Sequence, residues 1–216
     1  MRLLPSLVAL ICATPAWSGA WLREEGTGFV SASALQQQTG ETDAALYVEY
    51  GLRPKLTLGL MADADMTAGQ MGDGTVFVFA RKPLGGAERP FEMAYELGIG
   101  TTFGHSSDTL LRTGLSYGRG LTVGKRNGWL ALDGAVEWSL GDSPDTFKLD
   151  TTVGLAVNDR FKVMMQVFLS GAGDATSAAL APSVIWQPKP DRPSYQIGLE
   201  YEDDAIALRV GLWKSF

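Results

Sequence analysis

The feature that most constrains this chain is a two-residue alternation of apolar and polar side chains that recurs from residue 27 to residue 216. Between residues 44 and 50, the even positions hold Ala, Leu, Val and Tyr, whereas the odd positions hold Ala, Tyr and Glu. Successive side chains of a β-strand point to opposite faces, so the pattern predicts strands with two unlike faces. Because no stretch shows a convincing helical period, we expect an all-β fold.

About twelve such segments follow one another, and residues that favour turns (Gly, Pro, Asn and Asp) separate them. The expected strands cover 27–37, 44–50, 55–65, 75–82, 91–103, 109–123, 130–140, 147–157, 161–169, 178–187, 195–202 and 206–216. Most are close to the length that crosses a bilayer obliquely, and an even number returns both ends of the chain to one side. Pro182 cannot donate to a strand ladder, so a bulge or a strand end is expected there.

The first 20 residues predict a cleaved secretory signal peptide. Arg2 supplies a positive charge, residues 3–16 are an apolar stretch, and Ser18-Gly19-Ala20 provides the small residues that a signal peptidase reads. Cleavage after Ala20 would remove the sole cysteine and leave residues 21–216 as the barrel.

Composition excludes several classes of function. The chain has 18 Lys and Arg against 24 Asp and Glu, a net charge of −6, so it lacks the basic surface that binds nucleic acid. One His and one Cys argue against a His/Cys zinc site, and we expect neither a metal nor a cofactor. After residue 20 no apolar run is long enough for a membrane-spanning helix.

Aromatic residues of the apolar face lie mostly near the strand ends, and aliphatic residues fill the middles. Two aromatic belts around an aliphatic band are typical of a transmembrane barrel with two bilayer interfaces. A soluble secreted β-barrel that binds an apolar ligand is the alternative, because it also has two unlike faces, with the apolar one inside. The belt residues are Tyr50, Phe91, Tyr117, Phe161, Trp186, Tyr195 and Phe216 at one end, and Phe103, Trp138, Phe147 and Tyr201 at the other.

The last residues, Leu212-Trp213-Lys214-Ser215-Phe216, resemble the terminal strand of bacterial outer-membrane β-barrel proteins. The segment 46–52 followed by 55–59 is similar to strand–turn–strand segments of small porin-like families. This resemblance implies a bacterial outer-membrane location, with membrane lipids and lipopolysaccharide around the barrel. It also implies that the outer-membrane assembly machinery reads the final Phe216.

The polar face carries the charged residues that we expect to line the lumen. The pairing of neighbouring strands is expected to bring Glu49 opposite Lys55, Glu137 opposite Lys148, and Arg209 close to Glu200. Arg81 is ambiguous because Phe77 and Phe79 share its face. The lumen candidates are Glu49, Lys55, Asp63, Glu92, Glu96, Arg112, Asp133, Glu137, Lys148, Asp150, Lys162, Glu200 and Arg209.

These charges allow two readings of the lumen. An acidic surplus around a water-filled pore would favour cations, whereas paired charges could equally fill and stiffen a closed structural barrel. Either reading describes a porin-like or structural protein without enzymatic activity.

An outer-membrane lipid hydrolase is a further alternative, because the spacing of His105 and Ser107 resembles that of the His and Ser, two apart on one strand face, that such hydrolases use. A catalytic His also needs an orienting partner, and no suitable carboxylate is evident nearby in the sequence. We therefore expect a solvated loop at this position.

Overall fold

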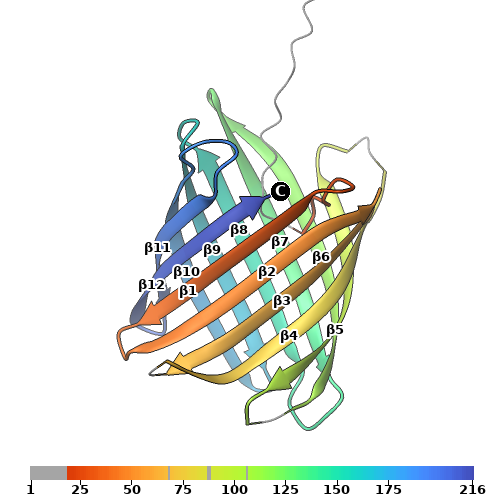
Figure 1. Cartoon of the computed structure of the whole chain (residues 1–216), viewed down its shortest axis with the longest axis vertical. Coiled ribbons are helices and arrows are strands. Elements are labelled where there is room, and N and C mark those ends of the chain that lie inside the picture. Colours follow the sequence, from red (N-terminus) through yellow and green to blue (C-terminus); the bar gives the residue numbers. More distant parts are fainter. Residues whose placement is uncertain (1–18, 68, 87–88, 106) are drawn as a thin grey trace, which may run out of the picture.

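The computed structural model describes residues 19–67, 69–86, 89–105 and 107–216. Within these ranges twelve strands close into one antiparallel barrel, in which each strand pairs with its sequence neighbours and β1 pairs with β12 (Figure 1). The same residues contain no helix long and apolar enough to cross a membrane. The strands are β1 Gly28–Gln37, β2 Glu41–Arg53, β3 Leu56–Thr67, β4 Gln70–Pro83, β5 Glu92–Phe103, β6 Thr109–Val123, β7 Arg126–Ser139, β8 Thr146–Ala156, β9 Phe161–Ala172, β10 Ala175–Trp186, β11 Ser194–Glu202 and β12 Ala205–Ser215.

The predicted all-β, up-and-down barrel is confirmed, and most strand bounds fall within a few residues of the expected ones. β2 and β4 begin earlier than expected, at Glu41 and Gln70, and β7 begins earlier at Arg126. Glu41 of β2 and Gln70 of β4 both lie opposite Thr67 of β3, so strand pairing continues beyond the segments of alternating hydropathy. The hydropathy pattern therefore predicted the part of each strand that has two unlike faces. It did not predict the polar residues at the strand ends.

Barrel closure joins the two ends of the described chain. The Gly28 N–H donates to the Phe216 carbonyl at 2.7 Å, and the Phe216 N–H donates to the Gly28 carbonyl at 2.9 Å. Register continues from Phe29 opposite Ser215 to Gln37 opposite Ala207. Both termini of the barrel therefore lie at the same end, which we call the terminal end; the opposite end is the distal end (Figure 1).

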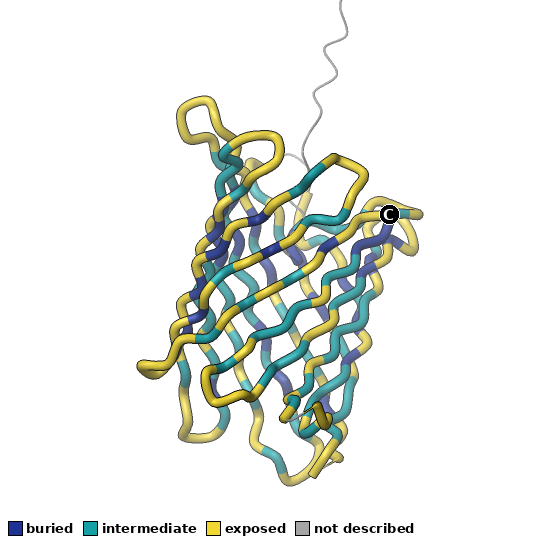
Figure 2. Tube along the Cα trace, turned by 60° about the vertical axis from the view of Figure 1, so that its left-hand side comes forward, coloured by how far each residue is buried: buried dark blue, intermediate teal, exposed yellow. Residues whose placement is uncertain are grey.

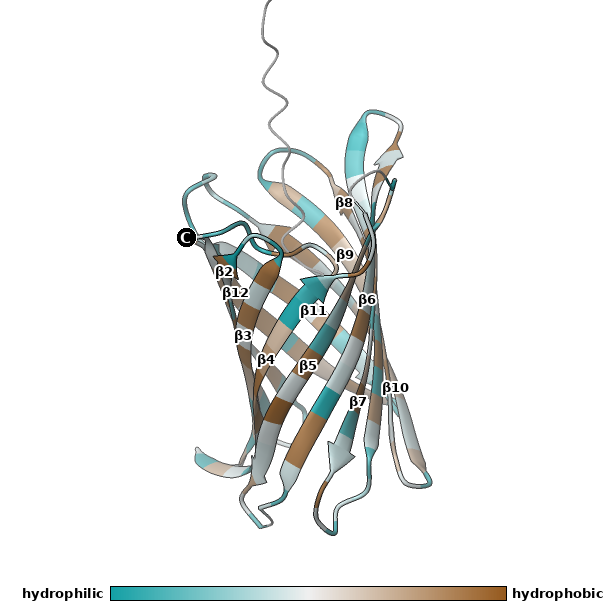
Figure 3. Cartoon of the chain, turned by 90° about the vertical axis from the view of Figure 1, so that its right-hand side faces the viewer, coloured by the Kyte–Doolittle hydropathy of each residue, from teal (hydrophilic) through white to brown (hydrophobic). Residues whose placement is uncertain are grey.

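The apolar face of the sheet points outward and the charged face points inward. Leu58, Val163 and Leu208 are 39%, 40% and 43% exposed, whereas Glu96 and Glu137 are 4% and 5% exposed. Exposed and buried residues alternate along the strands in Figure 2, as do hydrophobic and hydrophilic residues in Figure 3. This is the reverse of a soluble barrel with its apolar face inside.

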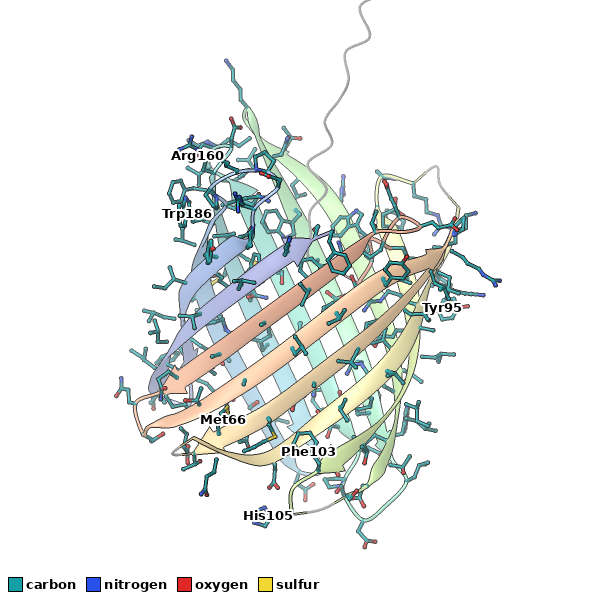
Figure 4. The ribbon with its side chains drawn as sticks, in the orientation of Figure 1. Met66, Tyr95, Phe103, His105, Arg160 and Trp186 are labelled. Atoms are coloured by element: carbon teal, nitrogen blue, oxygen red, sulfur yellow. The ribbon has the colours of Figure 1, made fainter. Side chains whose placement is uncertain are left out.

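Aromatic residues gather at both ends of the outer surface. At the terminal end, the rings of Trp186 and Tyr195 lie 5.6 Å apart. At the distal end, Trp138 donates from Nε1 to the Thr113 hydroxyl at 3.1 Å. Figure 4 places Trp186 and Phe103 toward opposite ends of the barrel, as the belt pattern predicts.

The expected irregularity at Pro182 takes another form. β10 runs through Pro182 without a bulge, and Pro182 pairs with Met165 of β9. On the other side, the β10–β11 pairing passes from Leu180–Tyr201 directly to Ser183–Gly198. Since a proline has no N–H, the ladder lapses there, but register is unchanged because pairing resumes on both sides.

Inward-facing aromatic rings cover glycines of the adjacent strand. Gly154 of β8 lies opposite Trp129 of β7, and a Cβ on Gly154 would lie 2.0 Å from the Trp129 ring. Gly59 of β3 is related to Phe79 of β4 in the same way, also with 2.0 Å. Glycine at these positions gives the rings room to lie flat against the wall.

This packing predicts that Gly154→Ala destabilises the barrel, because its methyl group must displace the Trp129 ring. Overpacking of this kind costs about 1–3 kcal/mol. The matched control is Gly120→Ala in β6, where an added Cβ meets nothing within 4 Å. Urea unfolding in detergent micelles should show a lower midpoint for Gly154→Ala alone; equal midpoints for the two variants would contradict the prediction.

Candidate functional site

A row of ion pairs crosses the inner wall, and Arg81 of β4 lies near its centre. Its guanidinium binds Glu49 of β2 on one side and Glu96 of β5 on the other, the latter at 2.5 Å. The Tyr47 hydroxyl also donates to Glu49, at 2.5 Å. All three charged residues are buried, at 5% exposure or less. They compensate one another, because an unpaired charge in such a place is strongly unfavourable.

The row continues from β5 to β8. Arg112 lies 2.8 Å from Glu96 and 2.5 Å from Glu137, so it links the two glutamates. Lys148 lies 3.1 Å from the same Glu137 carboxylate. Lys148 is directly opposite Ala135 rather than Glu137, so the expected contact forms on the diagonal. Charges of opposite sign thus alternate along the wall from Glu49 to Lys148.

A separate pair forms on the other side of the lumen, where Arg209 of β12 binds Glu200 of β11 as expected from the hairpin. The Arg209 Nε atom lies 3.1 Å from the Glu200 carboxylate. Glu200 is buried, at 6% exposure.

The expected pairing of Glu49 with Lys55 is wrong. Glu49 lies opposite Gly59, and Lys55 occupies the exposed turn between β2 and β3 with a φ of 65°. A Glu49–Lys55 pair would require a hairpin centred on residue 52, whereas the observed register, with Gly51 opposite Thr57 and Arg53 opposite Leu56, centres the hairpin on residues 54–55. The cations that reach Glu49 are Arg23 and Arg81 instead.

Four other candidates also lie on the inner face. Asp133 of β7 and Asp150 of β8 are directly opposite each other. Asp63 accepts a hydrogen bond from the Thr75 hydroxyl at 2.5 Å toward the distal end. Lys162 of β9 lies opposite the buried, inward-facing Ile185.

Glu92 is the first residue of β5 and is exposed at the terminal end. Within the described ranges, no group of three or more His, Cys, Asp or Glu side chains is arranged to hold a metal ion.

A cavity of about 290 Å³ lies beside the row of ion pairs. Charged groups from several strands meet there, together with aromatic residues of β1 and β2. Its lining includes Arg23, Phe29, Tyr47, Arg81, Glu96, Arg112, Asp133 and Asp150. The arrangement provides a confined polar space in the lumen, with carboxylates and guanidinium groups on its walls.

The sequence did not predict the apolar cluster inside the barrel. Side chains from β1, β7, β9, β10 and β12 form it, and Trp21 and Tyr47 pack against it. The residues that the sequence analysis assigns to the lumen are all charged. The sequence indicated apolar residues in the lumen at β4. Phe77 and Phe79 share a face with Arg81, so the inward face of this strand is apolar in part, like its outward face. The cluster consists of Phe29, Trp129, Ala131, Met164, Ile185 and Trp213.

His105 lies in the distal loop between β5 and β6, where Ser107 is also exposed; Ser106 is outside the described residues. Contrary to the sequence reading, His105 has a carboxylate partner: its Nδ1 lies 2.9 Å from Asp73 of β4. The His105 side chain is nevertheless 92% exposed. In the same loop, hydrogen bonds from Ser143 hold the pKa of Asp108 below its usual range.

Comparison with known proteins gives a structural answer. No family model matches the sequence, and no curated protein matches it. The solved structures that match include the KdgM porin, which is 10% identical with a TM-score of 0.63 and covers 87% of this chain and 99% of that chain. The COG4313 outer membrane channel from Pseudomonas putida F1 is 9% identical with a TM-score of 0.64, covering 91% and 98%.

The chain has the fold of outer-membrane porins. LpxR from Salmonella typhimurium shares it too, at 7% identity and a TM-score of 0.55, covering 86% of this chain and 99% of that chain. At such low identity the likeness concerns the fold alone. The predicted resemblance to small, porin-like outer-membrane barrels is confirmed at that level.

The ion-pair row predicts that Arg81→Ala strongly destabilises the barrel, because it leaves Glu49 and Glu96 buried with one cation fewer. Removing one partner of a buried pair costs about 3–5 kcal/mol. Arg192→Ala is the matched control, since Arg192 is exposed in the β10–β11 connection. Denaturant titration of the refolded barrels measures the difference, and an Arg81→Ala barrel as stable as the control would refute the role of the row.

Proposed function

We propose that this protein is a narrow, non-enzymatic channel of the bacterial outer membrane that favours cations. The observation that supports the proposal is that four basic side chains of the lumen are paired, whereas two opposed aspartates are not. Arg81, Arg112, Lys148 and Arg209 each already bind a glutamate. The opposed pair Asp133 and Asp150 forms no salt bridge within 4 Å among the described residues.

Four of the Arg and Lys side chains of the lumen are already paired with glutamates, and further carboxylates remain. This surplus of negative charge attracts positive ions into the lumen. Rings of Asp and Glu side chains select cations in channels generally. A second directly opposed acidic pair, Asp43 and Asp65, lies toward the distal end of β2 and β3 and adds to the surplus. The porin fold of the KdgM and COG4313 structures supports a channel, and the small cavity volume supports a narrow one.

The proposed location follows from the outer surface. An exposed aliphatic band between aromatic belts matches a bilayer, so we propose that membrane lipids and lipopolysaccharide cover it. We also propose that residues 1–20 are removed on export and that the assembly machinery reads Phe216. The Phe216 ring covers Gly28, where an added Cβ would lie 2.3 Å away, so this residue also seals the end of the β1–β12 seam.

Planar-bilayer recording of the refolded mature chain tests the channel. In a KCl gradient we expect single-channel currents whose reversal potential shows a preference for K⁺ over Cl⁻. The double variant Asp133→Asn, Asp150→Asn should shift the reversal potential toward zero, because it removes the uncompensated carboxylates. Anion preference in the unmodified chain, or silence despite verified insertion, would refute the proposal.

The contact between His105 and Asp73 favours a second candidate, a lipid hydrolase, because a carboxylate can orient a catalytic imidazole toward a Ser such as Ser107. The exposure of His105 argues against it, since the loop gives the ring no water-excluding pocket.

We expect lipopolysaccharide incubated with the purified protein to keep its acyl chains, as mass spectrometry would show, and His105→Ala to give the same spectrum. Acyl loss with the unmodified chain that disappears in His105→Ala would establish the hydrolase.

A further inference from the structure

Residues 21–27 precede β1 at the terminal end of the barrel; residues 21–23 are partly buried against the inner wall, and residues 24–26 are exposed at the rim. Trp21 lies against β6, where a Cβ on Gly118 would be 2.6 Å from its ring. The Arg23 backbone N–H donates to the Thr57 hydroxyl of β3 at 3.0 Å. The Arg23 guanidinium lies 2.6 Å from the Glu49 carboxylate of β2. The segment therefore passes from β6 to the wall formed by β2 and β3.

This path crosses the lumen, because β6 and β2 are not neighbours. In the closed order of strands, β3, β4 and β5 lie between them on the shorter way around. Adjacent strands are about 4.8 Å apart, so a segment that contacts both walls spans part of the interior instead of following one wall. Arg23 lines the 290 Å³ cavity, which places the segment next to the space beside the row of ion pairs.

Contacts hold the segment at both ends. Trp21 packs against the apolar cluster that includes Phe29 and Trp129. Beyond Arg23, the Gly26 N–H donates to the Gly51 carbonyl at 2.9 Å, and the Gly51 N–H donates to the Thr27 carbonyl at 2.9 Å.

Glycine is required at two wall positions that the segment touches. A Cβ on Gly51 would lie 2.0 Å from the Glu24 carbonyl oxygen, and a Cβ on Gly118 would lie 2.6 Å from the Trp21 ring. The wall is therefore shaped to receive this segment. Arg23 also extends the ion-pair row by one cation, since Glu49 binds both Arg23 and Arg81.

We propose that residues 21–27 are a strap that narrows the channel at its terminal end, and that Arg23 is the residue that holds the strap against the wall. The inference rests on the proposed channel function. Cleavage after Ala20 would leave the whole strap in the mature chain, with Trp21 as its first residue. The strap and the apolar cluster around Trp129 then together form the narrowest cross-section of the pore.

Single-channel conductance of refolded mature variants tests the strap. Arg23→Ala, and a second variant that lacks residues 21–24, should each raise the conductance about twofold or more, because the narrowest section limits ion flow. The matched control is Arg160→Ala, an exposed arginine in the β8–β9 turn at the same end (Figure 4), which should conduct like the unmodified chain. Heat-dependent gel mobility verifies that every variant forms the barrel.

A disulfide tests the position of the strap without relying on conduction. The sole cysteine, Cys12, lies within residues 1–20, so the mature double variant Arg23→Cys, Thr57→Cys carries only the introduced pair. We expect this pair to oxidise in the folded barrel, with low conductance while oxidised and higher conductance after reduction. The adjacent positions of the Arg23 backbone and the Thr57 side chain put the two sulfur atoms within reach.

The outcomes separate the two proposals. Failure of the disulfide to form in a folded barrel overturns the strap, as does equal conductance in the unmodified chain and both strap variants. If the disulfide forms but all variants are silent after verified insertion, the channel function fails and the narrowing role fails with it.

Discussion

Closure of the hydrogen-bonded ladder beneath an apolar surface is the constraint on which the rest of this structure depends. The outer face that exposes Leu58, Val163 and Leu208 suits a bilayer, which offers the backbone no water, and a barrel with such a surface must pair every strand on both sides. Pairing of β1 with β12 removes the last free edges. The lapse at Pro182 is tolerated because the β9 ladder continues on the other side and pairing with β11 resumes at Ser183.

Closure also decides where the charges go. With the outer face aliphatic, the polar half of each strand faces a confined interior, and charges there need partners within reach. Arg81 meets this need by bridging Glu49 and Glu96, the former across the intervening β3, and Arg112 meets it by bridging Glu96 and Glu137. The ion pairs thus tie β2, β4, β5, β6 and β7 together along the wall. Among the described inner-face candidates, Asp63, Asp133, Asp150 and Lys162 stay outside these ion pairs, and this net acidic remainder gives the lumen its proposed preference for cations.

Much of the fold and part of the site followed from the sequence, and the misses share a physical origin. Alternation identified the strands and their faces, and local hairpin geometry placed Arg209 near Glu200. The expected pairing of Glu49 with Lys55 failed because the hairpin is centred on residues 54–55 and not on residue 52, and hydropathy does not report the register. The cluster around Trp129 and the contact between His105 and Asp73 join strands or loops distant in sequence, and no local pattern encodes them.

The sequence alone determined that this chain is a membrane-type β-barrel with an apolar outer face and a charged inner face. The alternation of apolar and polar side chains is a local property that each strand carries in its own residues. Only the tertiary structure decided which charges meet, where aromatic rings fill the lumen, and that Trp21 and Arg23 cross it. These contacts depend on strand register and barrel closure, because only the closed ring brings side chains of opposite walls within contact distance.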